Sequence, residues 1–142
     1  MEDKNKIQAE HGSKIKEVID KWMEGWNEKN LDKIMECYSD TAELFDPKIK
    51  EFYKDTFVLE GKDNIKQYFS IILNLFPELQ IKPLGLWMKG YDAILEYYIY
   101  TTPETKIDVV SKFYINKHYK IQGHFNYYGL SYREVKEEGK QD

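Results

Sequence analysis

The chain has 142 residues, 42% of them hydrophobic and 32% charged, which suits one domain with a single sizeable core. Its net charge is −4 and Arg133 is its sole arginine, which argues against a nucleic-acid partner. The single cysteine, Cys37, excludes an intrachain disulfide, so we expect a reducing, cytoplasmic location. No apolar run reaches the length of a bilayer span, so we expect no membrane partner.

The first half of the chain predicts two helices and a strand. Residues 1–13 are polar and are expected to be frayed, whereas apolar residues recur at helical spacing over 14–26. The polar stretch 27–30 breaks this helix, and a second, shorter helix follows over 31–38. The segment "TAELFD", residues 41–46, has the composition of a strand.

The second half predicts one helix and then a sheet. Residues 48–60 are ambiguous, with a short strand expected at 57–59. The segment "GKDN" opens a third helix, for which Asp63 is the expected N-cap, and Pro77 ends it. Four stretches rich in branched and aromatic residues then predict strands separated by turns, at residues 79–88, 93–101, 107–115 and 121–128.

This element order predicts an α+β fold. Helices that precede a long meander of strands pack against one face of a curved, mostly antiparallel sheet. A curved sheet that is covered in this way encloses a cavity between the sheet and the helices.

The segment "ELFDPK" raises the question of a functional carboxylate. Pro47 holds Asp46 extended at the end of the predicted strand, directly after Leu44 and Phe45. Asp46 is then either an exposed turn residue or a carboxylate directed into an apolar cavity.

Three segments, "NLDKIMECYSDTAELFDP", "GKDNIKQYF" and "IDVVSKFYINKHYKIQGHFNYY", resemble the nuclear-transport-factor-2-like superfamily in order and spacing. The closer resemblance is to ketosteroid isomerases and SnoaL-like polyketide cyclases, over residues 14–130. The resemblance implies a single domain within residues 1–142, whose curved sheet wraps around a conical pocket. It implies no cofactor, a small apolar or aromatic ligand, and a homodimer.

The resemblance also implies roles for three residues. Asp46 matches the aspartate that serves ketosteroid isomerases as general base. The oxyanion-hole tyrosine of those enzymes falls on Trp22 and their protonated aspartate on Ser111. Since both acidic donors are replaced, steroid isomerase activity itself is not expected.

The last predicted strand offers a second candidate. Alternation places His124, Asn126 and Tyr128 on one face, which the isomerase-like register turns toward the pocket. His124 is then either an acid or partner that acts with Asp46, or a core histidine with both nitrogens satisfied. His11 lies in the expected frayed start and His118 in a predicted turn, so no cluster with ligand spacing exists and we expect no metal site.

The remaining pocket residues are expected from helix faces and strand parity. Glu96 is either a second pocket carboxylate, on one face with Tyr98, or an exposed acid. The predicted ligand-binding residues are Trp22, Trp26, Tyr38, Phe69, Glu96, Tyr98, Ser111, Phe113, Asn126 and Tyr128.

The opposite sheet face is too apolar for open solvent. Parity places on it Leu95, Tyr97, Ile99, Val110, Tyr114, Phe125 and Tyr127. Apolar patches of this kind usually mark an interface, which agrees with the implied homodimer.

Three functions stay open from the sequence. The chain is a small acid–base enzyme of the isomerase, cyclase or dehydratase kind, a non-catalytic binding module, or an interaction protein whose pocket is filled. An empty cavity of roughly 300 Å³ or more would fit the first two, and a collapsed cavity would favour the third.

Overall fold

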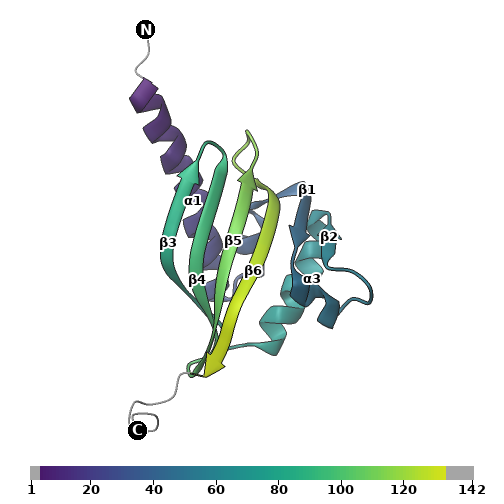
Figure 1. Cartoon of the computed structure of the whole chain (residues 1–142). Helices are drawn as coiled ribbons and strands as arrows, with labels where there is room; N and C mark the ends of the chain where they lie inside the picture. The colour runs from purple at the N-terminus through teal and green to yellow at the C-terminus, as the bar shows by residue number, and fades with distance from the viewer. Residues whose placement is uncertain (1–3, 134–142) are drawn as a thin grey trace, which may run out of the picture.

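A computed structural model describes residues 4–133 and has two layers, with α1 lying behind a curved sheet (Figure 1). The helices are α1 (Lys4–Glu28), α2 (Leu31–Met35), the 3₁₀ helix η1 (Pro47–Glu51) and α3 (Lys62–Leu75). The strands are β1 (Tyr38–Phe45), β2 (Val58–Glu60), β3 (Gln80–Lys89), β4 (Asp92–Thr102), β5 (Thr105–Ile115) and β6 (Ile121–Arg133). None of these helices is long and apolar enough to cross a membrane.

The sheet has six strands in the order β2-β1-β6-β5-β4-β3. All neighbours are antiparallel except β1 and β6, which pair in parallel. The predicted α+β fold with a curved, mostly antiparallel sheet is therefore confirmed. The parallel pair places the end of β1 beside the first part of β6, where Leu44 lies opposite His124 and Phe45 opposite Phe125.

The expected frayed start is wrong for the described residues, because α1 already begins at Lys4. Its first turns dock on the sheet through His11. The His11 Nε2–H donates to the carbonyl of Gly90 at 2.8 Å, and Nδ1 lies 2.9 Å from the Tyr119 hydroxyl. A polar helix start is therefore held by side-chain contacts that helical spacing alone does not reveal.

Two element boundaries also differ from the prediction. Tyr38 belongs to β1 and not to the second helix, which ends after five residues and is capped by Asn30. Gly61, not Asp63, is the N-cap of α3. Gly61 has φ +89°, a conformation that favours glycine, and its N–H donates to Ala42 O at 2.8 Å.

The inner face of β4 is opposite to the expected one. Leu95 and Tyr97 are buried at 1% and 2% exposure and face the helices, as does Ile99, so their predicted outer position is wrong. Glu96 is exposed and Tyr98 half-buried on the other face. Both faces of β4 carry apolar side chains. The charge of Glu96 determines which face is turned to solvent, because a carboxylate without a partner stays in water.

Close packing of α1 on α2 depends on Gly25. A Cβ at this position would lie 2.7 Å from Ile34 Cγ1 and 3.0 Å from the Ile34 backbone nitrogen. Since one of these atoms is backbone, the two helices would have to move apart.

We therefore expect Gly25→Ala to destabilise the protein by about 1–3 kcal/mol, the usual cost of overpacking. Urea unfolding followed by circular dichroism measures this change. Gly12→Ala is the matched control on the same helix, because its nearest neighbour, Met88 Cε, is 4.0 Å away. The control should gain about 0.5–1 kcal/mol from helix propensity, and equal stabilities for the two variants would contradict the packing argument.

Candidate functional site

Asp46 is a turn residue. It follows β1 in an extended conformation, with φ −150° and ψ 118°, and caps η1. Its Oδ1 accepts from the backbone N–H of Lys48 at 2.8 Å, and its own N–H donates to Phe57 O at 2.9 Å. Pro47, whose N–H is absent, occupies the first position of η1, where no hydrogen bond is required.

The same carboxylate also faces the interior, with 3% of the residue exposed. Its Oδ2 accepts from Asn126 Nδ2 at 2.9 Å and from the Tyr128 hydroxyl at 2.7 Å, both on β6. All three partners of Asp46 are donors, which stabilise an ionised carboxylate. Burial, and then the charge of Asp46, raises the pKa of Tyr128, so its hydroxyl keeps the proton that it donates.

Asn126 connects the carboxylate to a buried hydrogen-bond chain. Its Oδ1 accepts from the Ser111 hydroxyl at 2.5 Å. Because the Ser111 proton is used there, Ser111 Oγ accepts from the Tyr97 hydroxyl at 2.7 Å and from His124 Nε2 at 3.2 Å.

The end of this hydrogen-bond network that lies farthest from Asp46 fixes the tautomer of His124. The Trp22 Nε1–H can only donate, and it donates to the Tyr38 hydroxyl oxygen at 2.9 Å. The Tyr38 proton therefore points to His124 Nδ1, 2.8 Å away, and the histidine carries its proton on Nε2. Every hydrogen that this network donates therefore points toward Asp46.

His124 is neutral in this arrangement. Burial lowers its pKa from 6.5 to about 3, and both ring nitrogens are occupied by protein groups. Of the roles that the sequence left open, this geometry matches the core histidine with both nitrogens satisfied, which is linked to Asp46 only through Ser111 and Asn126.

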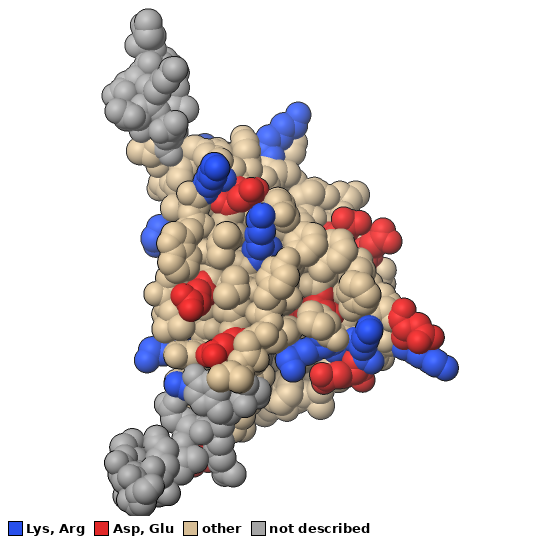
Figure 2. Space-filling model, viewed as in Figure 1, with Lys and Arg blue, Asp and Glu red and all other residues tan. Residues whose placement is uncertain are grey.

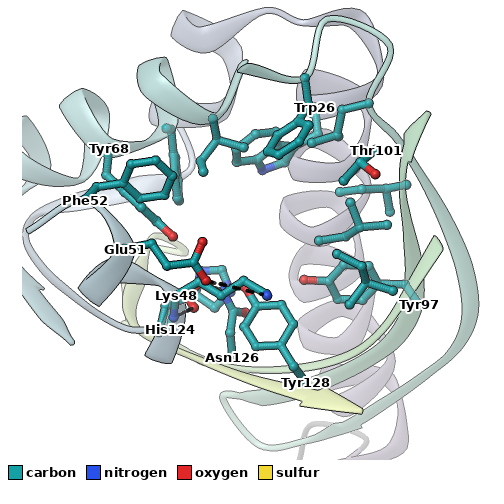
Figure 3. Close-up of a pocket in the computed structure, with 18 of the residues that line it drawn as sticks. Trp26, Lys48, Glu51, Phe52, Tyr68, Tyr97, Thr101, His124, Asn126 and Tyr128 are labelled. Atoms are coloured by element: carbon teal, nitrogen blue, oxygen red, sulfur yellow. Dashed lines mark hydrogen bonds and ion pairs between the residues drawn. The ribbon is translucent and has the colours of Figure 1, made fainter. Parts of the chain in front are cut away.

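A cavity of about 140 Å³ opens above this polar group, between the sheet, α1 and α3 (Figure 3). Its walls are mainly apolar and aromatic. They include Trp22, Trp26, Phe52, Tyr68, Phe69, Ile72, Phe76, Leu79, Ile81, Tyr97, Ile99 and Ile107. A cavity of about 150 Å³ holds one benzene-sized ring, so this one is smaller than expected but not collapsed.

Seven predicted site residues line the cavity: Trp22, Trp26, Asp46, Phe69, His124, Asn126 and Tyr128. Tyr38, Ser111 and Phe113 lie behind it, where the Phe113 ring stacks on His124 at 4.4 Å. Glu96 and Tyr98 lie on the opposite sheet face, so their prediction as pocket residues is wrong.

Several lining residues were not predicted as pocket residues, among them Tyr97 and the neighbours Lys48, Glu51 and Phe52. Tyr97 was assigned to the wrong parity, and the exposed charge of its neighbour Glu96 was the signal that could have corrected it. Lys48, Glu51 and Phe52 fall in the ambiguous segment that forms η1. The Lys48 ammonium lies 3.9 Å from the Glu51 carboxylate and 4.9 Å from the Tyr128 ring centre, at the polar end of the cavity.

Among residues 4–133, no three His, Cys, Asp or Glu side chains gather as a metal ion would require. Residues 19–124 match the SnoaL-like domain. The chain belongs to the SnoaL-like family. The nuclear-transport-factor-2-like resemblance is thereby confirmed. None of the curated proteins compared with the chain matches it.

Similar solved structures share this fold. One is a SnoaL-like protein of unknown function from Burkholderia thailandensis, with a TM-score of 0.74 and 18% identity over 83% of this chain and 97% of that chain. A second is SalBIII, an epoxide hydrolase/cyclase-like enzyme of pyran ring formation in salinomycin, with a TM-score of 0.69 and 22% identity over 84% and 93%. A third is TerC, co-crystallised with polyporic acid, with a TM-score of 0.68 and 12% identity over 82% and 92%.

The low pKa of His124 predicts acid sensitivity. Between pH 6.5 and about 3 the unfolded chain protonates this histidine and the folded protein does not, so stability falls as the pH decreases through this window. We expect His124→Gln to reduce the dependence of the unfolding free energy on pH by up to about 1.4 kcal/mol per pH unit, whatever its stability at pH 7. Urea unfolding at pH 6.5, 5.5 and 4.5 measures it.

His118→Gln is the matched control, because His118 is exposed in the turn before β6. Its pH dependence should follow that of the wild type. Equal pH dependence in His124→Gln and the wild type would show that His124 does not stay neutral in the folded protein.

Proposed function

We propose that this protein is a cofactor-free acid–base enzyme that acts on a small uncharged organic molecule, with Asp46 as general base. The observation that carries the proposal is a hydrogen-bonded carboxylate, 3% exposed, at the end of an apolar cavity. A buried carboxylate is costly unless it is hydrogen-bonded, and the three donors on Asp46 offset that cost.

The carboxylate keeps room for a proton. Two oxygens offer about four acceptor positions, and three of those on Asp46 are occupied by protein donors. The Oδ1 atom accepts only from the Lys48 N–H and retains one position. General base catalysis requires such a group within reach of a substrate proton, and contributes about 10²–10⁴ in rate.

The relatives support an organic substrate. SalBIII takes part in pyran ring formation, and TerC was crystallised with an organic acid. The apolar walls of this cavity suit part of such a molecule, with isomerisation, cyclisation or dehydration as the candidate reactions.

A non-catalytic binding module is the second candidate. The two positions that correspond to the oxyanion hole of ketosteroid isomerases hold Trp22 and Ser111, whose hydrogens are already donated to Tyr38 and Asn126. A protein that only binds a ligand would need the cavity and no free proton acceptor.

Exchange of α-protons separates the two candidates. The wild type should accelerate deuterium incorporation into small ketones such as cyclohexanone in D₂O, followed by NMR. Asp46→Asn should reduce this rate by at least about 10²-fold, because an amide is not a base at neutral pH.

Glu43→Gln is the matched control, since Glu43 lies exposed on the same strand and should exchange as fast as the wild type. In Asp46→Asn the new side-chain amide would face the Asn126 amide donor, so folding of this variant must be checked by near-UV circular dichroism. Ketone binding without exchange in the wild type would rule out the enzyme and favour the binding module.

We also propose that the outer sheet face pairs with a second copy of the chain. No described helix covers this face, which carries the partly exposed side chains of Trp87, Ile94, Val110, Tyr114 and Tyr127. Figure 2 shows this face, which is mostly uncharged but carries separate basic and acidic side chains scattered over it. The flat ring stack of Phe45 on Phe125, at 4.1 Å, adds to its apolar surface.

Tyr127→Asp should weaken the dimer, because it places a charge in the centre of the buried area, roughly 800 Å² per partner for a specific interface. Light scattering at micromolar concentration measures the mass. Leu75→Asp is the control, since Leu75 is equally exposed, at 52% against 57%, but lies on α3. A monomeric wild type would contradict the proposal.

A further inference from the structure

Trp26 carries a hydrogen-bond donor that the protein does not use. Among the described residues, Trp26 Nε1 and Tyr53 Oη are the two buried side-chain polar atoms without a hydrogen-bond partner. Trp26 is 6% exposed and lines the cavity, whereas Tyr53 does not. Figure 3 shows the Trp26 nitrogen facing into the cavity, from the side opposite Asn126 and Tyr128.

The comparison with Trp22 shows that this donor is unusual. Trp22 lies one helical turn earlier on α1 and lines the same cavity, but its N–H is bound to the Tyr38 oxygen. The Trp26 ring is fixed edge-on against Phe69 at 4.9 Å and against Trp22 at 6.3 Å. Its N–H therefore keeps its direction and cannot turn to an acceptor elsewhere.

A buried donor without a partner costs about 1–3 kcal/mol and calls for an explanation. Most of the residues that line the cavity with Trp26 are apolar, including Ile72, Phe76 and Ile81, and none of them accepts a hydrogen bond from its Nε1. An acceptor atom carried by a ligand would remove this cost.

We propose that the Trp26 N–H binds the oxygen of the ligand, and that the ligand is a small uncharged carbonyl compound with an apolar body of about one six-membered ring. The inference rests on the proposed function, in which this cavity is the ligand site. The size follows from the cavity volume of about 140 Å³. The absence of charge follows from Asp46, whose carboxylate disfavours an anion, and from the mainly apolar walls, which would not replace the hydration of a cation.

This assignment defines the chemical step. With the carbonyl oxygen on the Trp26 N–H, the Asp46 carboxylate accepts a proton from the adjacent carbon. The C–H electron pair forms the new C=C bond, and the carbonyl π pair moves to the oxygen, which becomes an enolate held by the Trp26 N–H. Return of the proton from Asp46, to the same carbon or to a conjugated one, completes an exchange or an isomerisation.

A pair of probes tests the donor directly. Cyclohexanone has an acceptor oxygen, and methylenecyclohexane has nearly the same shape without one. The chain has three tryptophans, so ¹H–¹⁵N spectra show three indole signals, which Trp26→Phe and Trp22→Phe assign. Cyclohexanone should move the Trp26 indole proton downfield, and methylenecyclohexane should not.

Affinities from the same titrations give the second readout. The wild type should prefer cyclohexanone by about fivefold to tenfold, the value of one hydrogen bond. Trp26→Phe should lose this preference and bind methylenecyclohexane within about twofold of the wild type, which also shows that the variant is folded. Trp87→Phe is the control and should keep the preference, because Trp87 is 57% exposed on β3 and does not line the cavity.

Two results would overturn the proposal: the same ketone preference in Trp26→Phe and the wild type, or binding of neither probe by the wild type. Equal indole shifts with both probes would show that water serves the N–H, and would also overturn it. Failure of the proposed function is distinct, because ketone binding at Trp26 without α-proton exchange removes the enzyme and leaves the ligand assignment intact.

Discussion

The structure depends on how the carboxylate of Asp46 is held where β1 ends. One oxygen caps η1 through the Lys48 N–H, and the other accepts from Asn126 and Tyr128 on β6. The first bond turns the chain away from the sheet, and the second pair ties this turn to the neighbouring strand. A single side chain therefore closes the polar end of the cavity. Asp46 and Glu51 are the two acidic residues among the described residues that line it.

The buried hydrogen-bond network behind Asp46 is uncharged, and all of its hydrogens are donated in the same direction, toward Asp46. Trp22, Tyr38, His124 and Ser111 each pass a hydrogen toward Asn126, and none of them needs to ionise. In a low-dielectric interior such a chain is stable only when every member is satisfied, because one unpaired member costs its full desolvation energy. Trp22 and Ser111, at the two positions that the resemblance matched to the oxyanion hole, thus hydrogen-bond within the protein and help to orient Asp46.

The fold followed from the sequence because its signals are local and repeated. The helical spacing before Trp26, the proline after Asp46 and the turn residues between long strands each restrict the backbone independently. The helix start at Lys4 was missed because its stability comes from the contacts of His11 with a distant turn and with Tyr119. Periodicity does not record such contacts.

The site was predictable only in part, for a related reason. Asp46, Asn126 and Tyr128 were found because strand parity and a proline fix their directions. The parity of β4 was not fixed, since Leu95 and Ile94 are equally apolar and only the charge of Glu96 distinguishes the two faces. The alternatives for Asp46, a turn residue or a cavity carboxylate, were not exclusive, because its two oxygens face different parts of the protein.

The contacts of Trp22 and Trp26 determine which hydrogen-bond donor the cavity offers. Both are buried indoles on one face of α1, four residues apart, and the sequence cannot tell them apart. Tyr38 accepts a hydrogen bond from the first indole nitrogen, and no protein group in the described part of the chain accepts one from the second. The Trp22 N–H is thereby bound within the protein, and the Trp26 N–H remains available as a donor.

The cavity then has an acceptor at one end and a donor at the other, with apolar walls between them. A ligand that satisfies both ends must carry an acidic hydrogen and an acceptor oxygen on the same small apolar frame, which is the arrangement found in a ketone and its α-carbon.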